Sequence, residues 1–378
     1  MPNEDRIYLS APYATESDVQ SVVGALRSGW VAPTGPSLTE FEDACSAYVG
    51  RAYAVGLSSG TAALHLGLKR LGVDEGSYVL VPSVTFAATA FAVTYLGATP
   101  FIVDVESDFG TLDSALVEGA VERIRASGGR VAAAIPVDLY GCSVDYAEVL
   151  EVCDSLDVPV LEDAAEGLGA SCGDDKLGSF GEASVLSFNG NKILTTSGGG
   201  MLLTDDEAFA NDVRKWATQS REPVVWYEHE EIGYNYRLSN ILAALGVSQL
   251  QRIDQTVDHR RDVRNWYREA LSGLEGMSVI DDPPWGWSNA WLTVARFDEA
   301  VWPGMPERVR LTLEEHNIES RTVWKPMHQQ PVFASAPHLL TGASDRLFRE
   351  GLCLPSGPVM TQELGEEVCG LIRETLAK

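Results

Sequence analysis

The chain of 378 residues is too long for one small core, and we expect one large domain followed by a smaller one. Its 28 Lys and Arg residues against 54 Asp and Glu residues give a net charge of −26, and a field of that sign repels phosphate backbones, which excludes nucleic acid as a general partner. Hydrophobic residues make up 45% of the chain, a share that excludes a disordered protein.

The cysteines and the N-terminal residues predict a reducing location away from membranes. The six cysteines form no C-x-x-C pair and do not cluster with histidine, so we expect reduced thiols and no metal site. Residues 1–6 contain no apolar signal core, and the longest apolar stretch, 86–96, is too short to span a bilayer. We therefore expect a cytoplasmic protein with no membrane partner.

Apolar runs alternate with helical patterns through the first two thirds of the chain. We predict helices at 61–71 and 85–96, and strands at 53–57, 78–82, 99–105, 131–137, 158–161, 183–188 and 201–204. Runs that are apolar throughout indicate strands buried on both faces of a parallel sheet. The expected class is therefore α/β, with a mostly parallel central sheet flanked by helices.

The composition changes near residue 252. A polar, arginine-rich helix is predicted at 252–271, and a stretch rich in proline and tryptophan follows at 281–291. We therefore place the large domain at residues 1–251 and a smaller C-terminal α+β domain at residues 252–378.

Polar residues follow several predicted strands, at the edge where ligands gather in sheets of this kind. Gly60 and Thr61 lie between a strand and a helix start, where free N–H groups can bind an anion, although a plain helix cap would use the same residues. Asp163 follows a buried strand, where a carboxylate needs a partner, and a capping or ion-paired aspartate is the alternative.

Lys192 lies in a turn rich in Gly, Ser, Thr and Asn that has no other basic residue. A lysine withdrawn from water at a sheet edge can form a Schiff base, with an ordinary surface lysine as the alternative. A phosphate cradle, a carboxylate and a lysine are the parts of a pyridoxal phosphate (PLP) site, so we predict PLP as the cofactor. Phe86 begins the helix after another strand and could stack on the PLP ring, unless it is an ordinary core aromatic.

The chain resembles the DegT-type nucleotide-sugar aminotransferases, a branch of the fold-type-I PLP enzymes, from Ile7 nearly to its C-terminus. The motifs that carry the resemblance are WVAPTGP at 30–36, SSGTAAL at 58–64, PSVTF at 82–86, VDLYG at 137–141, EDAAE at 162–166, GYNYRLSN at 233–240 and WKPMH at 324–328.

The resemblance implies how the cofactor is bound. Lys192 would form the Schiff base and shuttle the proton, and Asp163 would pair with the pyridinium nitrogen. Phe86 would stack on the ring, and the phosphate would be held by Gly60, Thr61 and Ser187. Glu166 would lie near the 3-hydroxyl of the ring, where many members of the family have glutamine.

The resemblance also implies a substrate pocket and a shared active site. Tyr140 and His328 would line the sugar pocket, although His328 could equally be a structural histidine. Asp138 replaces a histidine that is common in the family. Asn240 would reach the cofactor phosphate of the neighbouring subunit in a homodimer, with capping of the helix that follows as the alternative.

The turn SFNGNK at 187–192 and the run TTSGGGM at 195–201 most resemble transaminases of the bacillosamine and legionaminate type, which aminate C4 of UDP-linked 4-keto-6-deoxy-N-acetyl sugars. We therefore expect transfer of an amino group from an amino acid, glutamate by resemblance, to a nucleotide-linked keto sugar. One alternative is a related sugar C3-dehydratase, in which histidine replaces the lysine, and Lys192 argues against it. The other is a non-catalytic PLP-binding sensor, which usually carries a basic DNA-binding module that this chain lacks.

Overall fold

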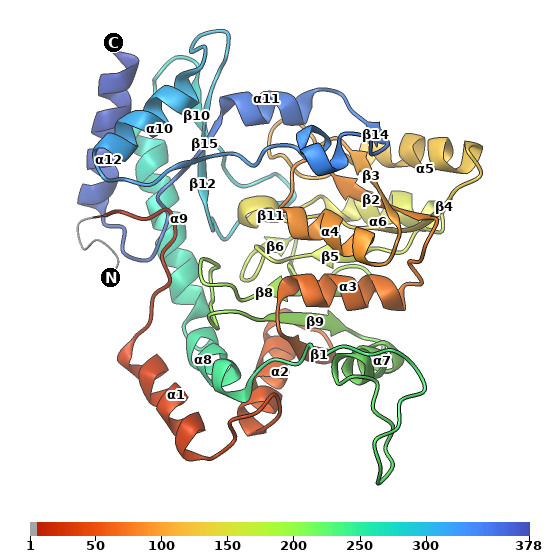
Figure 1. Ribbon diagram of the computed structural model, residues 1–378. Helices are drawn as coiled ribbons and strands as arrows, with labels where there is room; N and C mark the ends of the chain where they lie inside the picture. The colour runs from red at the N-terminus through yellow and green to blue at the C-terminus, as the bar shows by residue number, and fades with distance from the viewer. Residues whose placement is uncertain (1–5) are drawn as a thin grey trace.

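The computed structural model of the chain describes residues 6–378 and has a large layered part and a smaller part joined by one long helix (Figure 1). The central sheet consists of two four-stranded halves. Bridges between Ala134 and Val160 and between Val137 and Asp163 join them. In spatial order the strands are β1 (Tyr53–Leu57), β9 (Gly200–Thr204), β8 (Ala183–Ser187), β5 (Leu161–Asp163), β4 (Arg130–Ala134), β2 (Ser77–Pro82), β3 (Thr99–Val103) and β14 (His338–Leu339).

The sheet is mostly parallel, as predicted. Only β9 runs against its two neighbours, β1 and β8, among the strand pairs within residues 6–378 that form this sheet. Two hydrophobic cores lie on its two faces, which explains why the strands are apolar throughout. One core is supplied by α2 (Pro36–Val49), α5 (Val117–Ala126), α6 (Tyr146–Ser155) and α8 (Asn240–Leu250). The other is supplied by α3 (Gly60–Arg70), α4 (Ala87–Tyr95) and α7 (Glu207–Ala217).

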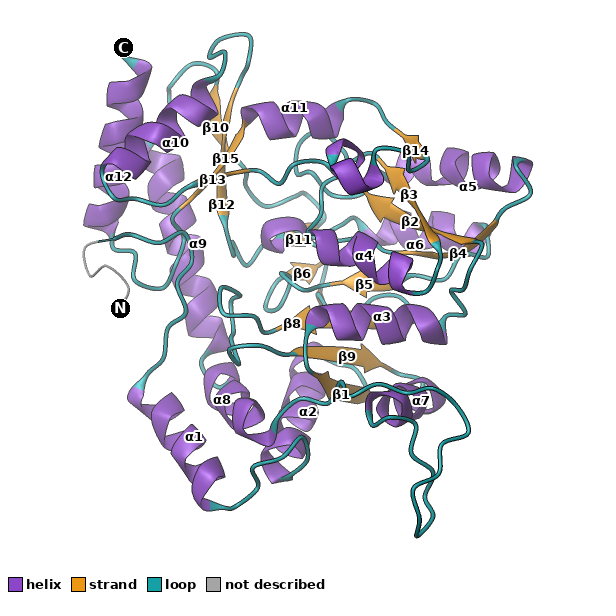
Figure 2. Ribbon diagram, in the orientation of Figure 1, coloured by secondary structure: helices purple, strands orange, loops and turns teal. Residues whose placement is uncertain are grey.

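The smaller part has its own antiparallel sheet and a third core. The long helix α9 (Ile253–Ala270) leads into it, and α1 (Glu16–Arg27) packs against α8 at the other end (Figure 2). The sheet order is β10 (Met277–Val279), β12 (Thr293–Phe297), β15 (Gly351–Leu354) and β13 (Arg321–Thr322). Around this sheet lie α10 (Met305–Glu315), α11 (Ala343–Glu350) and α12 (Gln362–Leu376).

Segments from each side of the predicted boundary at residue 251 pair with segments from the other side. The division of the chain into two domains at that residue stays a prediction. Ile7 bridges Ile318 in the smaller part, whereas β14 returns to the large sheet and pairs with β3. A third small sheet, of β11 (Gly286–Trp287), β6 (Ser171–Cys172) and β7 (Asp175–Lys176), also joins segments from the two sides of the boundary.

The strand predicted at 158–161 is displaced toward the C-terminus. It forms at Leu161–Asp163, so Asp163 ends the strand instead of following it. The cause is pairing with the segment after β4, because the Asp163 N–H donates to the Pro136 carbonyl oxygen at 2.9 Å. This pairing fixes the backbone of Asp163 and thereby directs its side chain.

The cysteines are dispersed through the fold. All six cysteines are free, and five of them are buried. Within residues 6–378, no cluster of His, Cys, Asp and Glu is arranged to bind a metal ion. No helix in this part of the chain combines the length and apolar character that crossing a membrane requires.

Asp104 joins the end of β3 to the start of α11. Its buried carboxylate accepts backbone N–H groups from Thr341 at 2.7 Å, Gly342 at 2.8 Å and Ser344 at 3.1 Å. Burial alone would raise the pKa of Asp104, but these hydrogen bonds outweigh it and lower that pKa to about 2. The ionised carboxylate therefore holds the smaller part against the large sheet.

We predict that Asp104→Ala lowers the free energy of unfolding by about 2 kcal/mol at neutral pH, because several buried N–H groups lose their acceptor. The pKa of Asp104 is lower in the folded chain than its ordinary value of 3.8. The stabilisation is therefore complete above about pH 4 and is lost as the pH falls toward 2.

Urea unfolding of both proteins across this pH range measures the effect, with Asp174→Ala in an exposed turn as the control. A difference between wild type and Asp104→Ala that stays constant down to pH 2 would contradict this account of Asp104.

Candidate active site

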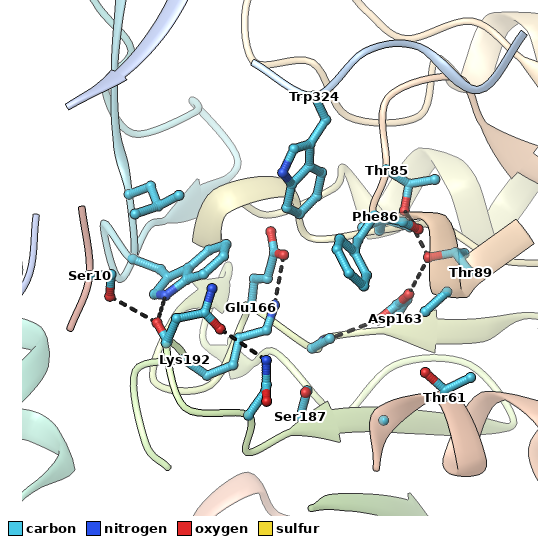
Figure 3. Close-up of a pocket in the computed structure, with 18 of the residues that line it drawn as sticks. Ser10, Thr61, Thr85, Phe86, Thr89, Asp163, Glu166, Ser187, Lys192 and Trp324 are labelled. Atoms are coloured by element: carbon cyan, nitrogen blue, oxygen red, sulfur yellow. Dashed lines mark hydrogen bonds and ion pairs between the residues drawn. The ribbon is translucent and has the colours of Figure 1, made fainter. Parts of the chain in front are cut away.

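A cavity of about 840 Å³ opens where the carboxyl ends of the central strands meet the smaller part (Figure 3). Its walls come from the segments after β1, β2, β5 and β8, from the N-terminal segment and from the smaller part. The predicted site residues that line it are Gly60, Thr61, Phe86, Asp163, Glu166, Ser187 and Lys192. Tyr140, His328 and Asn240 are not among the lining residues.

The start of α3 forms the expected anion cradle. The Ser59 hydroxyl accepts the Ala62 N–H at 3.0 Å, which leaves the N–H groups of Gly60 and Thr61 at the positive end of the helix. The start of β9 lies close to this helix start: a Cβ added to Gly200 would lie 2.5 Å from the Gly60 nitrogen, so only glycine fits there. Gly60 itself packs against Ser187 at the end of β8. The cradle is therefore built from the ends of three neighbouring elements.

Asp163 is a buried carboxylate supported by a threonine. Thr89 on α4 donates to its Oδ2 at 2.7 Å, and the Ala165 N–H donates to its Oδ1 at 3.2 Å. Burial raises the pKa of Asp163, while the hydrogen bond from Thr89 and the charge of Lys192 oppose the rise. A cation placed beside this carboxylate would keep it ionised.

Lys192 pairs with Glu166 inside the cavity. Its Nζ donates to Glu166 Oε1 at 2.8 Å, and the two side chains are only 10% and 3% exposed. The ring of Trp291 covers the same ammonium, with 4.2 Å between Nζ and the ring centroid. Burial raises the pKa of Glu166, and the charge of Lys192 opposes the rise. The alternative of a surface lysine is therefore wrong.

The loop that carries Lys192 is fixed by residues far away in the sequence. The carbonyl oxygen of Asn191 accepts the Trp291 indole N–H at 2.7 Å and the Ser10 hydroxyl at 2.8 Å. Sequence reasoning missed both donors. The only signal was the tryptophan-rich stretch at 281–291, which the composition marked without giving it a role.

Tyr140 lies behind the cavity wall. It has a left-handed φ of 55°, its hydroxyl accepts the Trp324 N–H at 3.0 Å, and its ring centroid lies 4.9 Å from that of Trp324. Trp324 in turn faces Phe86, with 5.6 Å between ring centroids. Phe86 is 58% exposed, so the alternative of an ordinary core aromatic is wrong. The two rings contact each other at a tilt of 56°, and both line the cavity.

His328 and Asp138 make contacts outside the cavity. His328 lies between Ser83 Oγ, 2.8 Å from its Nδ1, and Asp345 Oδ1, 2.9 Å from its Nε2. Asp138 is buried and accepts the Tyr146 hydroxyl at 3.1 Å. Burial and the neighbouring Glu162 raise the pKa of Asp138 well above its usual range. Neither residue is among those that line the cavity, and the sugar-binding role of His328 stays a prediction.

Asn240 is buried, and both ends of its amide are occupied within the chain. Its Oδ1 accepts the Leu38 N–H and its Nδ2 donates to the Trp30 carbonyl oxygen, both at 3.1 Å. Ser239 occupies the N-cap position of α8, so the alternative that Asn240 caps this helix is wrong. A contact with a neighbouring subunit's cofactor stays a prediction.

The cavity fits PLP by the chemistry of its donors. Backbone N–H groups at a helix start suit a phosphate, and a buried carboxylate that needs a cation suits a pyridinium nitrogen. An amine held between Glu166 and Trp291 lies in the same cavity. The rings of Phe86 and Trp324 contact each other and both line this cavity, so they offer aromatic surface against which a ring or a sugar can stack.

Comparison with known proteins gives matches over nearly the whole chain. The model of the DegT/DnrJ/EryC1/StrS aminotransferase family matches residues 12–373. The putative pyridoxal phosphate-dependent aminotransferase EpsN of Bacillus subtilis is 43% identical over 95% of this chain and 92% of its own length. GDP-perosamine synthase of Caulobacter vibrioides is 34% identical over 100% of both chains.

Two further proteins carry sugar substrates or products in their names. The UDP-4-amino-4-deoxy-L-arabinose–oxoglutarate aminotransferase of Shewanella sediminis is 31% identical over 86% of this chain and 84% of its own. The solved structure of DesI in the presence of its TDP-sugar product is 27% identical, with a TM-score of 0.91 over 100% of this chain and 94% of that one.

The Lys192–Glu166 pair should be strongly coupled, because both groups are withdrawn from water. In the cofactor-free protein, a double-mutant cycle with Lys192→Met and Glu166→Gln should give a coupling energy of about 2 kcal/mol in urea unfolding. The exposed pair Arg310–Glu307 on α10 is the matched control and should give about 0.5 kcal/mol or less. Equal coupling energies for the two pairs would contradict the buried ion pair.

Proposed function

Because this chain belongs to the DegT/DnrJ/EryC1/StrS aminotransferase family, we propose that it transfers an amino group from glutamate to C4 of a nucleotide-linked 4-keto sugar. The chain is a PLP-dependent aminotransferase. The observation that carries the proposal is the placement of Asp163 and Lys192 in one cavity, at the ends of the adjacent strands β5 and β8, beside a helix start that suits a phosphate.

Each cofactor contact can be assigned to a group of this chain. When bound, PLP supplies an electron sink that makes a proton on the adjacent substrate carbon removable. We assign the phosphate to the N–H groups of Gly60 and Thr61 and to the Ser187 hydroxyl. Asp163 would keep a proton on the ring nitrogen, and Thr89 fixes the direction of that carboxylate. Phe86 would stack on the ring and keep water from one face.

Lys192 Nζ is the group that moves the proton. It would remove a proton from the amine-bearing carbon of the donor and later deliver one to the acceptor carbon, a role worth about 10²–10⁴-fold in rate. Glu166 Oε1 accepts from Nζ at 2.8 Å and directs the amine. A related dehydratase would have histidine at this position, so Lys192 favours transamination.

The assignment to a nucleotide-linked sugar rests on the relatives and on the charge at the cavity wall. A relative carries both a 4-amino sugar and oxoglutarate in its name, which supports C4 as the acceptor carbon and glutamate as the donor. The net charge of −26 repels a diphosphate, so local cations are needed. Arg321 and Lys325 lie in the wall supplied by the smaller part. Resemblance of the Lys192 segment favours a UDP-linked 4-keto-6-deoxy-N-acetyl sugar.

We also propose a two-fold symmetric homodimer with shared active sites. Large apolar side chains are exposed on Phe86, which lines the cavity, and on Trp30, between α1 and α2; others lie on the projecting loop after α7, including Val225, Trp226 and Tyr227. Exposed groups of this kind are typical of an interface between subunits. For Asn240 to reach a partner's cofactor, its amide would have to leave Trp30 and Leu38.

We predict that Lys192→Ala loses turnover by about 10²–10⁴-fold while the fold remains, because Lys192 is the group that moves the proton. Turnover with glutamate and a keto sugar, together with circular dichroism, measures this. Lys176→Ala, on the small sheet of β6 and β7, is the matched control and should keep native turnover.

The same variant tests the shared site. In a mixed dimer of Lys192→Ala and Asn240→Ala subunits, action of Asn240 across the interface leaves one native site, so activity should exceed that of either mutant homodimer. A mixed dimer without any gain, or a monomer at working concentration, would refute the shared site.

The acceptor can be identified with protein preloaded with pyridoxamine phosphate. We predict the fastest amination with UDP-linked 4-keto-6-deoxy-N-acetyl sugars in a panel that includes GDP- and TDP-linked 4-keto sugars, pyruvate and oxaloacetate. The appearance of the amino sugar, followed by mass spectrometry, is the measurement. Faster reaction with pyruvate or oxaloacetate than with every keto sugar would overturn the proposed acceptor.

A further inference from the structure

Arg260, on α9, is a buried guanidinium whose hydrogen-bond partners are all uncharged. It is 2% exposed, its Nη1 donates to the carbonyl oxygens of Trp291 at 2.8 Å and Ser356 at 2.9 Å, and its Nη2 donates to Ser10 Oγ at 3.2 Å. Burial lowers the pKa of Arg260 to about 10. Taking a charge out of water without a counterion is costly, which points to a role beyond filling space.

Two of these three partners hold the loop of Lys192. The Trp291 indole N–H and the Ser10 hydroxyl both donate to the carbonyl oxygen of Asn191. Figure 3 shows Ser10 joined to this loop, next to Lys192. A serine hydroxyl has a single proton, so accepting from Arg260 leaves that proton directed at Asn191. Arg260 therefore fixes both the position and the polarity of the two donors.

Trp291 has a second contact with the reacting lysine. While its carbonyl oxygen is held by Arg260, the face of its indole lies 4.2 Å from Lys192 Nζ. A shift of this residue would move the Asn191 carbonyl and the surface against which the ammonium rests. The three hydrogen bonds of Arg260 go to Trp291, Ser356 and Ser10 and not to Glu166 or Lys192. Any effect of Arg260 on Lys192 therefore has to pass through these neighbours.

We propose that Arg260 is a positioning residue that sets the place of Lys192 through Trp291 and Ser10. The proposal rests on the proposed function, in which Lys192 is the reacting lysine. The competing account is that Arg260 only ties α9 to the segment after β15. Tyr267 offers the matched control, because it lies two turns further along α9 and its hydroxyl donates to the Pro355 carbonyl oxygen at 2.9 Å. It makes the same kind of tie without reaching the Lys192 loop.

The test compares Arg260→Gln, Arg260→Lys, Trp291→Phe, Ser10→Ala and Tyr267→Phe as PLP holoenzymes. Three quantities are measured for each: urea unfolding, the pH midpoint of the absorbance change of the bound cofactor, and kcat and KM for the half-reaction with glutamate. We expect Arg260→Gln to lower kcat by about 100-fold with little change in KM, as misplacement of a reacting group does. The absorbance midpoint should move by about half a unit or more.

The other variants separate positioning from stability. Arg260→Lys keeps the charge but lacks the planar fork that bridges three acceptors, so it should stay impaired in kcat. Trp291→Phe and Ser10→Ala should change kcat and the absorbance midpoint in the same direction as Arg260→Gln, and they keep the test decisive if Arg260→Gln does not fold. Tyr267→Phe should lower only the unfolding free energy. In the double variant Arg260→Gln/Trp291→Phe the loss should be smaller than the product of the two single losses, because Arg260 acts in part through Trp291.

Native kcat and a native absorbance midpoint in Arg260→Gln would overturn the inference, as would multiplying losses in the double variant. If Arg260→Gln does not fold, native values for both Trp291→Phe and Ser10→Ala would overturn it. These outcomes differ from failure of the proposed function, which would appear as turnover by Lys192→Ala. An inactive Lys192→Ala beside a native Arg260→Gln refutes the positioning role alone.

Discussion

The active site depends on how one lysine is withdrawn from water. The Lys192 ammonium is held between the Glu166 carboxylate, 2.8 Å away, and the face of Trp291, 4.2 Å from the ring centroid. Glu166 comes from the segment after β5 and Trp291 from the segment before β12, so both parts of the molecule have to be assembled before the lysine is fixed. The environment of Lys192 is therefore complete only when the large part and the smaller part are packed together.

Much of the fold could be predicted from local patterns. Continuous apolar runs identified the buried strands because each strand is covered on both faces. Ser59 and Gly60 identified the start of α3, which faces the cavity. The position of β5 could not be predicted in this way. Its bounds depend on pairing with Pro136 and Val137, which no pattern within 158–163 records.

The site residues divide in the same manner. Gly60, Asp163 and Lys192 could be found because their types at strand ends suggest a chemistry, and the cavity brings them together. The residues that hold the lysine loop could not be found. Trp291 and Ser10 share one acceptor, the backbone carbonyl oxygen of Asn191, which lies 100 and 181 residues away from them in the sequence. A backbone carbonyl oxygen accepts from any donor, so the sequence does not mark which residues will reach it. Tyr140 and His328 carry polar groups that suit a substrate, but in this chain those groups bind Trp324 and Asp345.

The central claim is that Lys192 is the group that reacts with the cofactor. Borohydride reduction of the PLP holoenzyme, followed by digestion and mass spectrometry of the peptides, tests it most directly, because a second lysine, Lys325, lines the same cavity. The account predicts the cofactor mass on the peptide that contains Lys192, and no covalently bound cofactor in the Lys192→Ala protein. Attachment to Lys325, or attachment that persists in Lys192→Ala, would contradict it.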